Sequence, residues 1–333
     1  MRKLLLIGLV FFITITSGQA QQDPMFTKYM FNTLIFNPAY AGSKEHMSVT
    51  LLHRDQWWGL DGGPTTQTLT IHSPMKGNRV GIGGSLLHDD IGPTKEIKLS
   101  GYYSYRISFN DGKSKLSFGL SASVSNWQAD FSELVLDNLA DPAFTAPQQE
   151  WLPNAGVGIF YYNPHFYLGL SVPSVLNNTF EENKGGTTLQ AAQVRHYYLG
   201  GGLILPFDAA NTIVFKPSFL IKNSNLFGEF QDDAMGNVGA PTEFDIDLSL
   251  LFYEALWVGA SFRSAFEGFN GDSSFDSADI WVAYFLRNGF RVGAAFDYTL
   301  TELQRPAQGS FEVILGYEFS YKESAILTPR YFF

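Results

Sequence analysis

The chain has 333 residues, a formal net charge of −10 and no cysteine. An acidic chain without a basic patch is a poor partner for nucleic acid, so nucleic-acid binding is excluded. The absence of cysteine excludes a small disulfide-stapled domain and a lipid anchor on an N-terminal cysteine. Because no Pro/Ser-rich or charged linker interrupts the pattern, we expect one domain after the leader.

Residues 1–20 have the layout of a cleavable secretory signal. Arg2 and Lys3 precede an apolar run over 4–15, and small residues end the segment at 18–20. We expect the mature chain to begin near Gln21, and loss of Arg2 and Lys3 makes its charge about −12. No later run of roughly 18 apolar residues occurs, so helices are not expected to cross a membrane.

Residues 21–45 do not alternate as a strand would. Pro24 and the apolar residues that follow it predict a short helix, which Asn37-Pro38 ends. We expect this segment to lie on the periplasmic side, either as a plug that enters a barrel or as a docking surface.

From residue 46 onward, apolar and polar residues alternate with a period of two, which is typical of strands with one apolar face. Leu116–Ser125 is the clearest case, followed by 244–250 and 311–319. The pattern predicts about fourteen strands of the length that a tilted membrane crossing needs. They are 46–54, 65–73, 79–88, 95–108, 114–128, 152–162, 165–172, 194–205, 211–221, 243–253, 255–263, 279–286, 289–298 and 310–321.

Short and long connections alternate in the second part of the chain. The tight turns are 110–113, 163–164, 253–255 and 287–289, and the long connections are 129–151, 173–193, 222–242, 264–278 and 299–309. Outer-membrane barrels have short periplasmic turns and long external loops, and aromatic residues near strand ends are typical of their interfacial girdles. We therefore predict an all-β fold, a transmembrane antiparallel β-barrel over 46–321 with a tail at 322–333. The alternative is a secreted, lectin-like β-sandwich with an aromatic core.

Residue patterns that carry chemistry are weak. The six histidines lack a metal-ligand spacing, and Asp89-Asp90 and Asp232-Asp233 do not match a calcium loop. The chain has no G-x-S-x-G motif, and its glycine pairs do not form a G-x-G-x-x-G loop between a strand and a helix. We expect no catalytic residue, no metal site and no cofactor.

Charged residues on the C-terminal strands fall on the polar face, which would line the lumen of a barrel. They are Arg263, Arg291, Asp245, Asp247, Asp297, Glu312 and Glu318. Opposite charges there predict a fixed network that holds the barrel shut. An ion-selective pore lining is the alternative.

Several motifs resemble those of the PorP/SprF family, outer-membrane proteins of the type IX secretion and gliding-motility machinery of Bacteroidota. They are Gln22-Asp23-Pro24, the box Asn37-Pro38-Ala39-Tyr40-Ala41-Gly42, Arg54-x-Gln56-Trp57, Gly63-Pro64-x-x-Gln67, Asn78-x-x-Gly81-x-Gly83-Gly84 and the ending Pro329-Arg330-Tyr331-Phe332. The matches are dense up to about residue 105. The candidate partner-binding or motif residues are Asn37, Pro38, Ala39, Tyr40, Ala41, Gly42, Arg54, Gln56, Trp57, Pro64, Gln67, Pro329, Arg330, Tyr331 and Phe332.

The resemblance implies an integral barrel of the cell outer membrane, in contact with its lipid and without enzymatic activity. Its implied partners are the periplasmic ring components of the secretion system, or a secreted surface adhesin recognised through its C-terminal sorting domain. An outer-membrane channel or porin-like transporter is the alternative function.

Overall fold

The computed structural model describes residues 28–44, 46–75, 77–130, 148–184, 187–192, 195–224, 231–232, 236–237, 242–266, 274–301 and 307–319. The predicted signal at 1–20 and the tail at 322–333 lie outside these ranges. Within them, no helix has both the length and the apolar character to cross a membrane.

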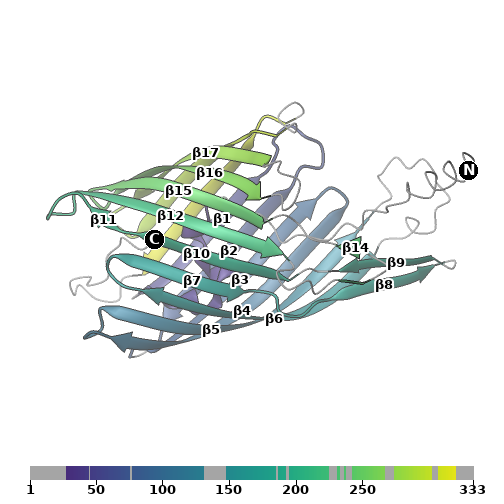
Figure 1. Cartoon of the computed structure of the whole chain (residues 1–333), viewed down its shortest axis with the longest axis horizontal. Coiled ribbons are helices and arrows are strands. Elements are labelled where there is room, and N and C mark those ends of the chain that lie inside the picture. The colour runs from purple at the N-terminus through teal and green to yellow at the C-terminus, as the bar shows by residue number, and fades with distance from the viewer. Residues whose placement is uncertain are drawn as a thin grey trace, which may run out of the picture.

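Fourteen antiparallel strands form one closed barrel (Figure 1). In chain order they are β1 Met47–Asp55, β2 Thr65–Pro74, β3 Val80–Ile91, β4 Thr94–Phe109, β5 Ser114–Ala129, β6 Gln148–Tyr162, β7 Phe166–Val172, β10 His196–Leu203, β12 Ile213–Ser224, β15 Thr242–Phe252, β16 Leu256–Phe266, β17 Ser274–Phe285, β18 Phe290–Thr299 and β19 Ser310–Phe319. Pairing of β1 with β19 closes the barrel. The short strand β11 Leu205–Pro206 adds to β12.

The predicted strands are confirmed, and the largest errors are at strand starts. Strand β6 begins at Gln148 rather than at 152, because it pairs with β5 as far as Gln148 opposite Ala129. Strand β17 likewise begins at Ser274 rather than at 279. Both extensions continue into connections where the alternation fades, so only the neighbouring strand reveals them.

The barrel turns its apolar side chains outward and its polar side chains inward. Leu99 and Leu120 are 59% and 58% exposed, whereas Ser104 and Ser117 are fully buried. This arrangement is inverted relative to a soluble sandwich, which buries its apolar face, and it is what a lipid-facing barrel requires. The alternative of a secreted β-sandwich is therefore wrong.

The two ends of the barrel differ. At the short-turn end the strands are joined mainly by connections of a few residues, such as 110–113, where Asn110, Asp111 and Gly112 have positive φ as tight hairpins require. The connection 204–212 is longer there and contains β11.

At the long-loop end the connections are longer, except for the two residues 92–93. Two hairpins belong to this end, β8 Thr179–Lys184 with β9 Thr187–Ala192, and β13 Gln231–Asp232 with β14 Gly236–Asn237. In Figure 1 the β8–β9 hairpin extends past the ends of the barrel strands. By the rule for outer-membrane barrels, the long-loop end faces the exterior.

Residues 28–44, the plug segment, pack inside the barrel and precede β1 at the short-turn end. The segment consists of η1 Tyr29–Phe31, α2 Thr33–Phe36 and η2 Pro38–Tyr40. Asn37 is extended, with φ −133°, as the residue before a proline prefers. Its side-chain oxygen accepts a hydrogen bond from the Ala39 amide at 2.9 Å and so caps η2. The helix predicted before Asn37-Pro38 is therefore two short turns, η1 and α2, a third turn begins at Pro38, and Pro24 lies outside the described residues.

Candidate functional site

A row of small side chains crosses five adjacent strands on the lumen face. Strand pairing places Gly81 beside Ser104, Ser104 beside Gly119, Gly119 beside Gly158, and Gly158 beside Ser171. All five face inward and are buried. Because none has a side chain larger than a hydroxymethyl group, a backbone can lie directly against the wall here. We call these residues the small-residue row.

The Asn37–Gly42 box lies on this row. Ser104 Oγ donates to the carbonyl oxygen of Ala41 at 2.7 Å, and Ser171 Oγ donates to that of Phe36 at 2.7 Å. A Cβ atom added to Gly119 would collide with the backbone of Ala39. The wall glycine is therefore required by the close approach of the plug segment rather than by a turn.

Other residues of the box make equally specific contacts with the wall. Asn37 Nδ2 donates to the carbonyl oxygen of Ile159 at 3.0 Å, and the Gly42 amide donates to His72 Nδ1 at 3.1 Å. Gly42 has φ +64°, and a Cβ atom there would lie 2.7 Å from Gly81 Cα. Tyr40 packs edge-on against His72, with ring centroids 5.2 Å apart. The box is thus fixed by shape and by hydrogen bonds together.

The first residues of the plug segment contact the opposite wall. Lys28 Nζ forms an ion pair with Asp279 and donates to Ser261 Oγ at 2.7 Å. The ring of Phe31 packs edge-on against Trp257 and Trp281, with centroid distances of 5.0 and 5.3 Å. The plug segment therefore spans the lumen from the β3–β7 wall to the β16–β17 wall.

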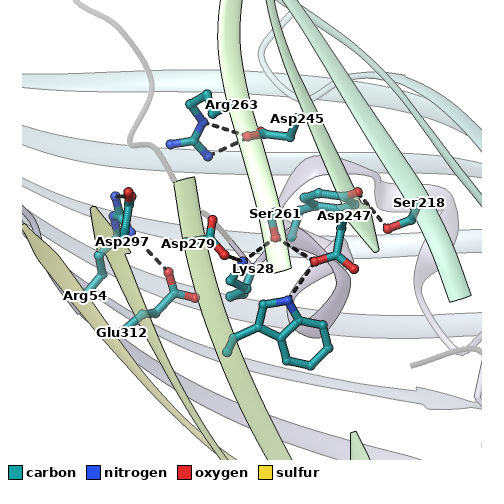
Figure 2. Close-up of polar contacts among 12 residues, drawn as sticks. Lys28, Arg54, Ser218, Asp245, Asp247, Ser261, Arg263, Asp279, Asp297 and Glu312 are labelled. Carbon is teal, nitrogen blue, oxygen red and sulfur yellow. Dashed lines mark hydrogen bonds and ion pairs between the residues drawn. The ribbon is translucent and has the colours of Figure 1, made fainter. Parts of the chain in front are cut away.

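A network of charged residues lies beside Lys28 (Figure 2). Arg54 contacts Asp297 at 3.1 Å and Glu312 at 3.5 Å. Arg263 pairs with Asp245 at 2.8 Å. These side chains are at least 88% buried, and charges so buried require partners. Of the predicted inward-facing charges, Arg263 and Asp245 pair with each other, whereas Asp297 and Glu312 pair with Arg54, which the prediction did not include.

The other charges of that prediction are held differently. Arg291 donates through Nη2 to Thr50 Oγ1 at 2.9 Å, and its guanidinium lies 5.2 Å from the centroid of the Phe31 ring. Asp247 accepts from Ser261 Oγ at 2.6 Å and from Trp281 Nε1 at 2.7 Å. Glu318 pairs with Lys44 of the plug segment at 2.8 Å. Charges on the barrel wall thus hold the plug segment as well as one another.

The remaining motif residues lie elsewhere. Gln56, Trp57 and Pro64 belong to the β1–β2 connection, where the Gln56 amide donates to the Pro64 carbonyl at 2.8 Å. The Trp57 amide donates to Ser310 Oγ at 3.2 Å, which ties this connection to β19. Gln67 is exposed on the outer wall, and 329–332 lie outside the described residues. The candidate residues therefore do not converge on one surface, and Asn37–Gly42 is buried in the lumen.

Sequence reasoning missed the small-residue row and the contact between Lys28 and Asp279. The signal for the row was glycine or serine at inward positions of adjacent strands, which becomes visible only once the strands are aligned. Across the part of the chain that the structure describes, no group of three His, Cys, Asp or Glu residues could hold a metal ion. What the site can do chemically is bind and hold chain segments.

Similarity to a solved structure supports the fold. The CymD monoaromatic hydrocarbon channel aligns with a TM-score of 0.50 at 12% identity, over 89% of this chain and 94% of that chain. A Pseudomonas aeruginosa FadL homologue gives 0.48 at 12% identity, over 90% and 95% of the two chains. Acinetobacter baumannii outer membrane protein Omp33 gives 0.42 at 13% identity, over 84% and 100%. At 12% identity the likeness to the CymD channel concerns the barrel fold alone.

No curated protein matches the chain. Residues 18–317, however, match the family described as type IX secretion system membrane protein PorP/SprF. The match covers the plug segment and nearly the whole barrel, and it agrees with the outer-membrane architecture. The chain therefore belongs to the PorP/SprF family of type IX secretion system membrane proteins.

Proposed function

We propose that this protein is a non-catalytic anchor of the outer membrane, which binds a secreted surface protein delivered by the type IX secretion system. The observation that carries the proposal is the plug segment. A barrel whose own chain is hydrogen-bonded to both walls of the lumen is built as a scaffold rather than as an open pore. Family membership supplies the secretion context.

The asymmetry of the two ends favours a partner on the outside. Most short-turn connections are only a few residues long and offer little surface for a partner. The long-loop end carries the β8–β9 and β13–β14 hairpins, and the first of these extends past the barrel (Figure 1). Loops placed on a rigid scaffold are the common location of binding sites. A secreted protein held at the cell surface would meet this end.

Co-purification from native outer membranes tests the proposal. The protein would carry an affinity tag in the turn 110–113, at the short-turn end, and would be extracted in mild detergent. We expect a secreted surface protein to be recovered with it. Replacing the β8–β9 hairpin by a short Gly-Ser linker should abolish this recovery while leaving the barrel folded, because the hairpin pairs only with itself among the described strands.

A matched control keeps this experiment specific. A Gly-Ser linker of the same length inserted into the turn 253–255 changes the short-turn end of the barrel. This insertion should leave recovery of the partner unchanged. If only periplasmic ring components were recovered, the protein would be assigned a ring-docking role instead of the role of a surface anchor. Recovery of no secretion component and no secreted protein would refute the proposal.

A further inference from the structure

The outer half of the lumen, between Lys28 and the long loops, is rich in acidic side chains. Lys28 marks the middle of the barrel, because Asp279 and Ser261 are each the sixth residue of their strands, β17 and β16. Among the described residues that are at least partly buried, the inward-facing acidic side chains at or beyond this depth are Asp89, Glu96, Glu243, Asp245, Asp247, Asp279, Asp297 and Glu312, and the cations among them are Lys28, Arg54, Lys98, Lys222 and Arg263. Carboxylates therefore outnumber cations in this half of the lumen.

One ammonium group is already bound at the base of this region. Lys28 is completely buried, and its Nζ atom contacts Asp279 and Ser261 (Figure 2). Ser261 also donates to Asp247, so one carboxylate and one hydroxyl contact the cation directly and a second carboxylate lies behind the hydroxyl. Trp281 closes the site, with its ring centroid 5.7 Å from Lys28 Nζ. This is a built site for a primary ammonium group.

A second observation indicates that the region has capacity for a further donor. Asp297 is 4% exposed, and its Oδ1 atom has no hydrogen-bond partner among the described residues, although Oδ2 binds Arg54. A buried carboxylate oxygen left without a donor is costly. A cationic group that enters from the long-loop end would supply one.

We propose that the outer half of the lumen is a receptor for a Lys-bearing segment of the secreted partner, and that Lys28 occupies its innermost ammonium site as an internal stand-in. The inference rests on the proposed anchoring function, since it names the chemistry by which that partner is recognised. The incoming ammonium group displaces Lys28 from Asp279, and the first turn of the plug segment then loses its ion pair with the β16–β17 wall.

Competition between Lys28 and an external lysine makes the proposal testable with the full-length protein in detergent. The probe is a tetralysine peptide, with a tetraglutamate peptide as its charge-reversed control, and binding is measured by calorimetry. Lys28→Met removes the internal competitor and leaves the carboxylates in place. We expect it to bind tetralysine about tenfold more tightly than the wild type. Adding Asp279→Asn to the same variant should reverse this gain.

Lys98→Gln is the matched control. Lys98 is an inward-facing cation of the same half of the lumen, and it contacts a hydroxyl, that of Ser174, at 3.3 Å. Its substitution makes the same change in net charge without freeing Asp279. If Lys28→Met and Lys98→Gln tighten tetralysine binding equally, the effect is one of net charge and the proposal is overturned. Failure of tetralysine to bind the wild type and the Lys28→Met variant would overturn it as well.

A milder variant covers the case in which Lys28→Met does not fold. Lys28→Gln removes the ammonium charge but keeps an amide donor beside Asp279, so it should tighten tetralysine binding in the same direction by a smaller factor. An unchanged affinity would contradict the proposal. Peptide binding without recovery of a surface protein from membranes would refute the anchoring function and leave the ammonium site standing.

Discussion

Asn37 Nδ2 donates to the carbonyl oxygen of Ile159 at 3.0 Å, which joins the plug segment to the backbone of β6. The same side chain accepts from the Ala39 amide at 2.9 Å. One amide group thus shapes the plug segment and fixes it to the wall. Because the acceptor is a backbone atom, this contact depends on the register of β6 and not on a partner side chain.

Asn37→Ala removes both hydrogen bonds of this amide. We expect a loss of about 1–2 kcal/mol in the free energy of unfolding, because the site is buried and one cap is lost with one wall contact. Denaturant unfolding in detergent, followed by tryptophan fluorescence, measures this change. Substitution of the exposed Asn177 by Ala is the control and should change the stability by less than about 0.5 kcal/mol. Equal effects of the two substitutions would contradict the role of Asn37.

Gly119→Leu tests the small-residue row. The new side chain would collide with the Ala39 backbone, so we expect the box to be forced off the wall and the barrel to be destabilised by about 1–3 kcal/mol or more. Gly101→Leu is the matched control, since that glycine faces outward and a Cβ atom there has no atom within 4 Å. Thermal unfolding measures the loss of stability in each of the two variants. A Gly119 variant as stable as the wild type would show that the row does not hold the plug segment.

Arg54→Met leaves two buried carboxylates, Asp297 and Glu312, without their common cation. Removal of one partner from a buried ion pair costs about 3–5 kcal/mol, so a marked fall in the unfolding midpoint is expected. The control is Lys95→Met, because Lys95 is 60% exposed and its pair with Asp90 should be worth less than about 1 kcal/mol. Adding Glu312→Gln to the Arg54 variant should recover part of the loss, and a further fall instead would argue against the network.

Deletion of residues 28–42 tests whether the plug segment closes the lumen. A fourteen-stranded barrel encloses more space than its wall side chains fill, although less than a porin. We expect the wild type to be silent in planar bilayers and the deletion variant to conduct. Stable conductance by the wild type would instead support the channel alternative and remove the main support for a closed anchor.

Much of the barrel could be predicted because its signal is local. The alternation in Leu116–Ser125 reports directly which residues face lipid, and Asn110-Asp111-Gly112 reports a turn without reference to any other strand. Boundaries were less certain, as at Gln148, where the strand continues only because β5 offers a partner. The same alternation predicted which charged residues of the C-terminal strands face the lumen.

The strand rhythm, the inward and outward faces and the likeness to the PorP/SprF family could all be predicted from the amino-acid pattern. The contacts of the plug segment depend instead on the closed barrel. Lys28 and Asp279 are 251 residues apart, and Gly81, Gly119 and Gly158 align only through strand register. Register is set by pairing across the whole barrel, and a one-residue slip would turn these glycines to the lipid. No local pattern carries that information, and so the site emerged from the closed barrel alone.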